Sequence, residues 1–160
     1  MTTPSRRFEM QVNLLSGPPC QLDGARRPLA GDKRALAELM FAAYQGTVDY
    51  SGESVEDAEI EMEKTFTGGY GTFSPECSYV VERASELVCA SLITFHRQVP
   101  LLAFAMTAPA WKRNGLARAA VLGSMHDLRA RGATQLHLAV NPRNQFAIDL
   151  YESLGFEAKP

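Results

Sequence analysis

The segment Met106–Ala117 joins an apolar run to the start of a helical pattern, and its residue types suit a phosphate-binding turn. Two basic residues, Lys112 and Arg113, precede Asn114 and Gly115 there. Small residues at such a turn leave backbone N–H groups accessible, and a helix N-terminus adds about half a positive charge. A pyrophosphate group would fit this arrangement. Taken alone, the segment is equally compatible with an ordinary strand-to-helix turn carrying solvated basic side chains.

A second segment with chemical potential runs from Asn141 to Phe156 and has the pattern of an amphipathic helix that stops at Gly155. Asn144 stands where a helix N-cap is expected, and Tyr151 lies two turns later on a similar face. The apolar stripe is predicted to hold Phe146, Ala147, Leu150, Tyr151 and Leu154.

In this order the two segments resemble the GNAT superfamily of acyl-CoA-dependent N-acetyltransferases. Residues Lys112–Ala117 are similar to the family's pyrophosphate loop, (Gln/Arg)-x-x-Gly-x-(Gly/Ala), with Lys112 in place of the usual arginine or glutamine. Residues Asn144–Phe156 are similar to its Asn-x-x-Ala-x-x-Leu-Tyr-x-x-x-Gly-Phe segment. The resemblance implies an α/β (α+β) fold with a mixed, largely antiparallel central sheet flanked by about four helices.

The resemblance also implies acetyl-CoA as the cosubstrate, with its pantetheine arm between the strand at Leu101 and the strand at Gln135. Pantetheine carries two amides, so a free strand edge can pair with it as with another strand. Asn144 has an alternative role as a helix N-cap, and the two roles are compatible. No metal is implied. The cofactor-binding residues implied are Met106, Thr107, Lys112, Arg113, Asn114, Gly115, Leu116, Ala117 and Asn144.

Tyr151 is, by the same resemblance, the general acid that donates a proton or a hydrogen bond to the departing coenzyme A thiolate. Without the resemblance it would be interpreted as a core residue of the apolar stripe. Ordinary pKa values of about 10 for tyrosine and about 8.5 for a thiol make full proton transfer uphill by roughly 2 kcal/mol. A hydrogen bond is therefore sufficient for the role.

The general base is less defined, because Ala139 stands where many family members carry a glutamate. His137 faces the same side of that strand and is the predicted base, although a histidine in a strand can be purely structural. A water chain ending at a backbone carbonyl needs no single base. The other candidate side chains are Asp49, Glu53 and His96.

The amine acceptor is expected beside the first two helices and their connecting loop, where acidic and hydroxyl-bearing residues gather: Asp49, Tyr50, Ser51, Glu53 and Glu56. Such a surface suits a cationic small-molecule or peptide amine, although the same residues are ordinary on a solvated loop. The predicted function is acetyl transfer from acetyl-CoA to a primary amine by direct attack. The alternative is a non-catalytic acyl-CoA-binding sensor or partner subunit, favoured by Ala139 and disfavoured by Tyr151.

Length and composition restrict the class of protein. The 160 residues predict an N-terminal arm over 1–19 and a single domain over 20–160. With 46% apolar residues, 21% charged residues and a formal charge of −2, the chain reads as globular, and we expect no nucleic acid partner. No apolar run approaches the ~18 residues of a membrane span. The three cysteines fit neither a disulfide framework nor a zinc site, so we expect a soluble cytoplasmic protein with free thiols.

Local patterns predict the elements that position these residues. Asp32 is placed to cap the first helix, and Ser54–Asp57 has the pattern of a capping box for the second. The long helix after the phosphate-binding turn is predicted over 115–131. The strand Leu101–Thr107 is almost wholly apolar, which predicts a central strand covered on both faces. The other predicted strands are Tyr79–Glu82, Leu87–His96 and Gln135–Val140.

The first residues carry a further strand pattern, over Phe8–Leu15. The sequence ends soon after Phe156, where family members commonly continue into one more strand, so the Gln135–Val140 strand would have an unpaired edge. We predict that Phe8–Leu15 covers this edge, either in its own subunit or across a homodimer. A disordered arm is the alternative.

Overall fold

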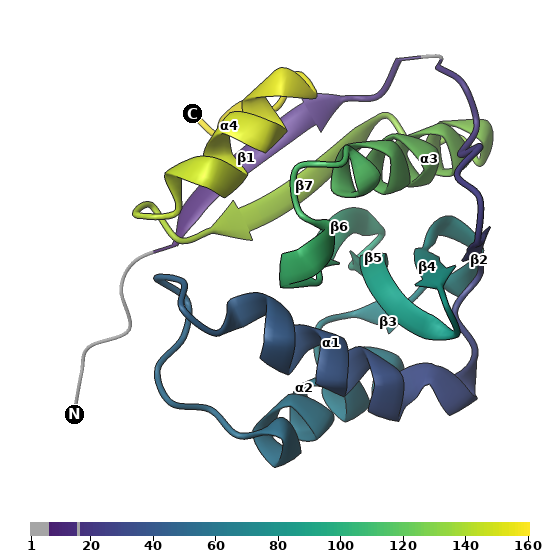
Figure 1. Ribbon diagram of the computed structural model, residues 1–160. Helices are drawn as coiled ribbons and strands as arrows, with labels where there is room; N and C mark the ends of the chain where they lie inside the picture. The colour runs from purple at the N-terminus through teal and green to yellow at the C-terminus, as the bar shows by residue number, and fades with distance from the viewer. Residues whose placement is uncertain (1–6, 16) are drawn as a thin grey trace.

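A mixed sheet with helices on both faces organises the computed structural model, which describes residues 7–15 and 17–160 (Figure 1). In the described part the sheet has eight strands in the order β2-β4-β5-β6-β7-β1-β8, with β3 paired to β5. The strands are β1 Phe8–Asn13, β2 Ala25–Arg26, β3 Thr72–Phe73, β4 Tyr79–Arg83, β5 Glu86–His96, β6 Val99–Thr107, β7 Gln135–Val140 and β8 Glu157–Ala158.

The two faces carry different helices (Figure 1). Helices α1 and α2 lie together on one face, and α3 and α4 lie on the other. Neighbouring strands are antiparallel except for β6 and β7, which run parallel. The predicted fold class is therefore confirmed. The helices are α1 Lys33–Tyr44, α2 Val55–Thr67, α3 Leu116–Ala130 and α4 Gln145–Ser153.

The N-terminal strand lies inside the sheet, between β7 and β8. Its register with β7 runs from Phe8 opposite Val140 to Asn13 opposite Gln135, which confirms that this segment covers the β7 edge within its own chain. The strand ends at Asn13 rather than at Leu15. The last residues also form a strand, β8, which pairs with β1 on the side away from β7. Part of the predicted arm, residues 1–6 and 16, lies outside the described residues.

Helix caps follow the sequence pattern at α2 and depart from it at α1. At α2, Ser54 Oγ accepts a hydrogen bond from the Asp57 N–H at 3.1 Å, and Asp57 Oδ2 accepts one from the Ser54 N–H at 2.8 Å. Asp32 occupies the N-cap position of α1, as predicted, but its side chain makes no capping hydrogen bond there. Its carboxylate instead accepts hydrogen bonds from the Leu29 N–H and from the guanidinium of Arg26, because a 3₁₀ turn precedes the helix.

Strand β6 is central, as predicted, but it is not covered on both faces. Leu102 and Met106 are buried, whereas the intervening residues 103–105 are half-buried. The register with β5 passes from Leu92–Phe104 to Ile93–Leu102, so Ala103 is an extra residue that forms a bulge. A bulge bends the strand and re-aims the side chains beyond it, and here those side chains line a cavity.

Two smaller corrections concern helix ends. Helix α3 begins at Leu116, one residue later than predicted, because Gly115 is its N-cap. The prediction that Phe146 belongs to the apolar stripe of α4 is wrong. Phe146 is 59% exposed because it lies in the first turn of the helix, outside the core that Ile148 and Tyr151 enter. In the described part of the chain, no helix has the length and apolarity needed to cross a membrane.

Candidate active site

The parallel strands β6 and β7 meet near one end and then separate. Their pairing in the described structure consists of Leu101 opposite His137. Further along β6, Met106 and Thr107 pair with β5 through Ala90 and Cys89 on one side. Their other edge has no strand partner among the described residues, which agrees with the splay expected for a pantetheine arm.

A cavity of about 920 Å³ lies where the two strands separate. Its walls come from α1, the α1–α2 loop, α2, β5, β6, β7, β1 and α4. Of the predicted site residues, the cavity brings together Asp49, Tyr50, Glu53, His96, His137, Asn144 and Tyr151. The described lining does not include Ser51 or Glu56, nor Met106, Thr107 and the 112–117 loop, which lie outside the cavity.

The 112–117 loop presents mainly backbone to the outside. Gly115 adopts the left-handed conformation at φ 75°, and a Cβ added there would meet no described atom within 4 Å. Arg113 and Asn114 are exposed, whereas the side chain of Leu116, the first residue of α3, is buried, so Leu116 can offer a ligand only its backbone N–H. The first N–H groups of α3 have no partner inside the helix. The loop therefore forms an open, electropositive turn that fits a pyrophosphate group.

Two side chains of this loop are engaged in the protein itself. Lys112 Nζ donates to the Ala43 carbonyl at 3.3 Å, which links the loop to the end of α1. Asn114 Nδ2 donates to the Trp111 carbonyl at 3.1 Å and stabilises the turn. These two side chains therefore hold the loop in shape, and their part in binding a cofactor stays a prediction.

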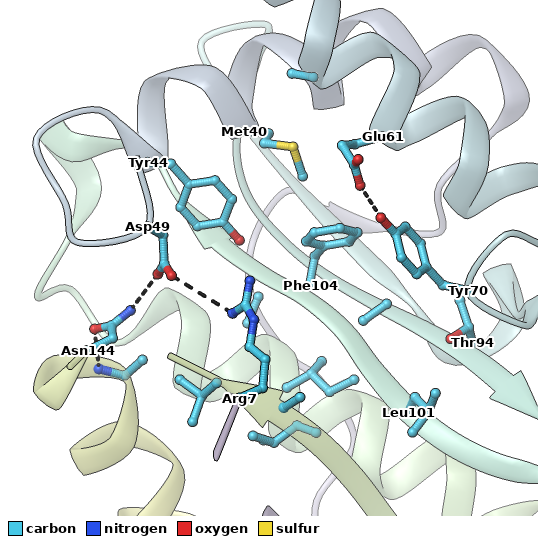
Figure 2. A pocket seen from close by; sticks show the side chains of 18 of the residues that line it. Arg7, Met40, Tyr44, Asp49, Glu61, Tyr70, Thr94, Leu101, Phe104 and Asn144 are labelled. Carbon is cyan, nitrogen blue, oxygen red and sulfur yellow. Dashed lines mark hydrogen bonds and ion pairs between the residues drawn. The ribbon is translucent and has the colours of Figure 1, made fainter. Parts of the chain in front are cut away.

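Asn144 connects α4 to the loop between α1 and α2 (Figure 2). Its Oδ1 accepts the Ala147 N–H at 3.1 Å, so the predicted N-cap role is confirmed. Its Nδ2 donates to Asp49 Oδ2 at 3.0 Å. Both ends of the amide are therefore in use, and its direct contact with the cofactor stays a prediction.

Tyr151 is held on α4, on the α3 side of the sheet, yet it borders the cavity on the opposite side. Because β6 and β7 diverge, a side chain from α4 can reach the cavity from the other face of the sheet. Burial raises the pKa of Tyr151 to about 12, and the nearby charge of Asp49 acts in the same direction. The hydroxyl is consequently protonated at neutral pH and available as a hydrogen-bond donor.

His137 lies at the closed end of the divergence, opposite Leu101. Burial lowers its pKa, the charge of Lys159 lowers it further, and the carboxylate of Glu9 opposes both. Its Nε2 lies 3.2 Å from Gln135 Oε1, and its Nδ1 is buried without a hydrogen-bond partner in the described structure. The imidazole is therefore neutral at pH 7, and its role as the base stays a prediction.

The acceptor side of the cavity is more acidic than the sequence indicated. In the described structure the cationic lining residues are Arg7 and Lys159, whereas the carboxylates are Glu9, Asp49, Glu53, Asp57 and Glu61. The excess of carboxylates supports the expected preference for a cationic amine. Among the described residues, no group of three or more histidine, cysteine, aspartate or glutamate side chains is placed to hold a metal ion.

Several lining residues were missed by sequence reasoning. Tyr70 donates to Glu61 and packs edge-on against Phe104, with 5.9 Å between ring centroids (Figure 2). The hydroxyl of Thr94 is fully buried and has no hydrogen-bond partner in the part of the chain that is described. The four-residue spacing of Asp57 and Glu61 beside Ala58 could have placed both on one α2 face. No local signal marks Thr94 or Tyr70.

Comparison with known proteins identifies the family. The sequence model of the acetyltransferase (GNAT) family matches residues 37–156, and the chain therefore belongs to this family. The chain is 29% identical over 132 residues to a mycothiol acetyltransferase from Thermobispora bispora, which covers 78% of this chain and 43% of that protein. It spans less than half the length of the curated relatives it matches.

Solved structures show the same fold. A GCN5-related N-acetyltransferase from Sphaerobacter thermophilus superposes with a TM-score of 0.72 at 19% identity, over 96% of this chain and 48% of that one. The PaiA N-acetyltransferase from Thermoplasma acidophilum, solved in complex with coenzyme A, gives a TM-score of 0.66 at 16% identity, over 84% of this chain and 89% of that one. At these identities the likenesses show that the chain shares the fold of these proteins.

Proposed function

We propose that the chain is an acetyl-CoA-dependent N-acetyltransferase that moves the acetyl group to a primary amine by direct attack. The observation that carries the proposal is the cavity at the divergence of β6 and β7. Its lining includes Tyr151, residues 101–105 of β6 and the carboxylates of the α1–α2 loop and α2, which supports this proposal. When bound, acetyl-CoA supplies an activated thioester carbonyl.

The chain's own groups fit coenzyme A along one path. The open turn at Gly115 and the first N–H groups of α3 receive the pyrophosphate, with the exposed Arg113 beside them. The unpaired edge at Met106 and Thr107 pairs with the pantetheine amides. This path leads into the cavity that Tyr151 borders.

Tyr151 acts by hydrogen bonding to the departing sulfur. With a pKa of about 12 for its hydroxyl and about 8.5 for an ordinary thiol, complete proton transfer is uphill by about 5 kcal/mol. A donated hydrogen bond stabilises the developing negative charge without this cost. The neutral His137 is the base expected from the sequence, on the β7 wall of the same cavity.

The acceptor is a small-molecule or peptide amine that enters from the acidic side of the cavity. The relative from Thermobispora bispora is named for mycothiol acetylation, so the acceptor of that enzyme belongs among those tested. The free thiols Cys20, Cys77 and Cys89 support a reducing, cytoplasmic setting. A homodimer is also proposed, and its test is the mass in solution.

The alternative proposal is a non-catalytic acyl-CoA sensor or partner subunit, favoured by the lack of a titratable group at Ala139. A coenzyme A release assay over a panel of amines, combined with calorimetric titration of acetyl-CoA, separates the two. We expect turnover on at least one amine. Micromolar acetyl-CoA binding with no turnover on any amine would support the sensor instead.

A further inference from the structure

We propose that Asp49 is the carboxylate that binds the attacking nitrogen and accepts its proton, with Asn144 as the positioning residue that holds it. This inference rests on the proposed acetyltransferase function and deepens it. Asp49 lies in the loop that joins α1 to α2, whereas the predicted base His137 lies on β7. The two assignments therefore make different predictions.

The position of Asp49 is fixed by the helix that carries the acid. Its side chain is 15% exposed, lines the cavity and accepts the Asn144 Nδ2–H at 3.0 Å. Asn144 caps α4 with its other amide atom, and Tyr151 belongs to the same helix. The Asn144 amide thus fixes the Asp49 carboxylate relative to α4, which carries the Tyr151 hydroxyl proposed to face the departing sulfur.

The remaining hydrogen-bonding capacity of Asp49 allows it to hold a substrate nitrogen. An ionised carboxylate offers about four acceptor positions on two oxygens. Oδ2 accepts from Asn144, and Oδ1 lies 3.8 Å from Arg7 Nη1, so Asp49 forms an ion pair with a second lining residue (Figure 2). Positions remain for an N–H donor from the cavity.

The titratable and charged groups that face Asp49 come from three elements. Arg7 approaches from the segment before β1, Tyr44 from α1 and Tyr151 from α4. Burial is the main reason that the pKa of each tyrosine is raised, and the charge of Asp49 raises it further. Asp49 and Tyr151 both line the cavity, which brings the charge of the carboxylate near the Tyr151 hydroxyl.

The other acidic candidates are less well placed for this task. Glu53 is exposed and accepts the Ser51 N–H at 2.8 Å, so it serves its own loop. Glu61 is engaged by the Tyr70 hydroxyl. Neither is tied to α4 by a hydrogen bond in the described structure, whereas Asp49 is.

The proposed step conserves atoms and charge. The neutral amine nitrogen bonds to the thioester carbonyl carbon, the carbon–sulfur bond breaks, and its electron pair leaves with the sulfur. The nitrogen loses one proton to the Asp49 carboxylate as it becomes positively charged. Tyr151 hydrogen-bonds the thiolate, and the proton on Asp49 then reaches the sulfur through water, giving an amide and a free thiol.

The direct test is Asp49→Asn, which removes charge and basicity while keeping an oxygen that accepts from Asn144. We expect kcat to fall about 10²-fold with an unchanged acetyl-CoA dissociation constant by calorimetry. Glu152→Gln, which neutralises an exposed carboxylate on α4, is the matched control and should keep wild-type turnover. Wild-type kcat in Asp49→Asn would overturn the proposal. If His137→Gln loses turnover while Asp49→Asn keeps it, the base is His137 and the proposal is also overturned.

The positioning role is tested by Asn144→Ser, which keeps an N-cap oxygen but cannot reach Asp49 in the same way. We expect kcat to fall about tenfold while the Tm and the KM for acetyl-CoA stay unchanged. An unchanged kcat would remove Asn144 from the proposal, and this variant also serves if Asp49→Asn does not fold. If the wild-type protein shows no turnover on any amine, the proposed acetyltransferase function is wrong. If wild type and Asp49→Asn turn over equally, the function stands and only the role of Asp49 is wrong.

Discussion

The proposed cofactor side, which lies outside the cavity, and the acceptor side, which lines it, differ in the chemical groups that they offer. The cofactor side offers backbone: the open turn at Gly115, the first N–H groups of α3 and the free edge of β6 at Met106. The acceptor side offers side chains, mostly carboxylates, from the α1–α2 loop and α2. A backbone site suits a ligand that never changes, while side chains can vary without disturbing the fold.

The two sides also differ in how their parts are distributed along the sequence. The turn at Gly115 and the N-terminus of α3 are consecutive in the chain, so one motif describes them. The acceptor wall joins residues as distant as Asp49 and Asn144 through one hydrogen bond. A sequence motif can therefore identify the residues of the cofactor side, but not those of the acceptor side. Substitutions on each side test the two separately.

The largest effect is expected from Gly115→Asp, on the cofactor side. Space for a Cβ exists there, and aspartate is among the residues that best tolerate a positive φ, so the variant should fold. Its carboxylate would occupy the anion-binding turn and repel the pyrophosphate. We expect calorimetry to detect no acetyl-CoA binding.

The matched control is Gly115→Asn, which has nearly the same shape and backbone tolerance without the charge. It should bind acetyl-CoA more weakly than wild type but measurably. Equal affinity of wild type and Gly115→Asp would remove the pyrophosphate from this turn.

The next effect is expected from Tyr151→Phe, at the junction of the two sides. The variant keeps the aromatic ring that packs against Phe156 and removes the hydrogen bond to the sulfur. We expect kcat to fall by roughly 10²-fold or more, with little change in the acetyl-CoA dissociation constant. Steady-state kinetics and calorimetry on the same preparation provide both values, and wild-type turnover would reduce Tyr151 to a packing residue.

A smaller effect, on stability rather than chemistry, is expected from β1, which pairs with β7 and contributes Glu9 to the cavity lining. Met10 is 1% exposed and faces the core, whereas Gln11 on the other face is half-buried. We expect Met10→Ala to lower the free energy of unfolding by about 3 kcal/mol and Gln11→Ala to change it by less than about 1 kcal/mol. Chemical denaturation measures both, and equal values would mean that β1 packs loosely in solution.

Sequence reasoning predicted the parts of the molecule that depend on local pattern. The N-cap at Asn144, the capping box at Ser54 and the strand at Phe8 each follow from short-range spacing, and all three are confirmed. The coverage of the β7 edge followed from the energetic cost of leaving a strand unpaired.

The parts that depend on long-range packing could not be predicted. The bulge at Ala103 leaves no mark in an apolar run, yet it turns residues of β6 toward the cavity. A local contact was also missed, because Asp32 has the residue type of a cap but its carboxylate accepts from Arg26 and from the Leu29 N–H. The contact between Asp49 and Asn144 requires the loop and α4 to be placed by the whole sheet.

The central claim is that this cavity joins an amine to the acetyl group of acetyl-CoA. The most direct measurement incubates the wild-type protein with acetyl-CoA and an accepted amine and quantifies both products, the free thiol by a chromogenic reagent and the acetylated amine by mass spectrometry. We predict one acetylated amine for each thiol released, with both products reduced in parallel in Tyr151→Phe. Thiol release without acetylated amine, or no release from bound acetyl-CoA with any amine, would contradict the account.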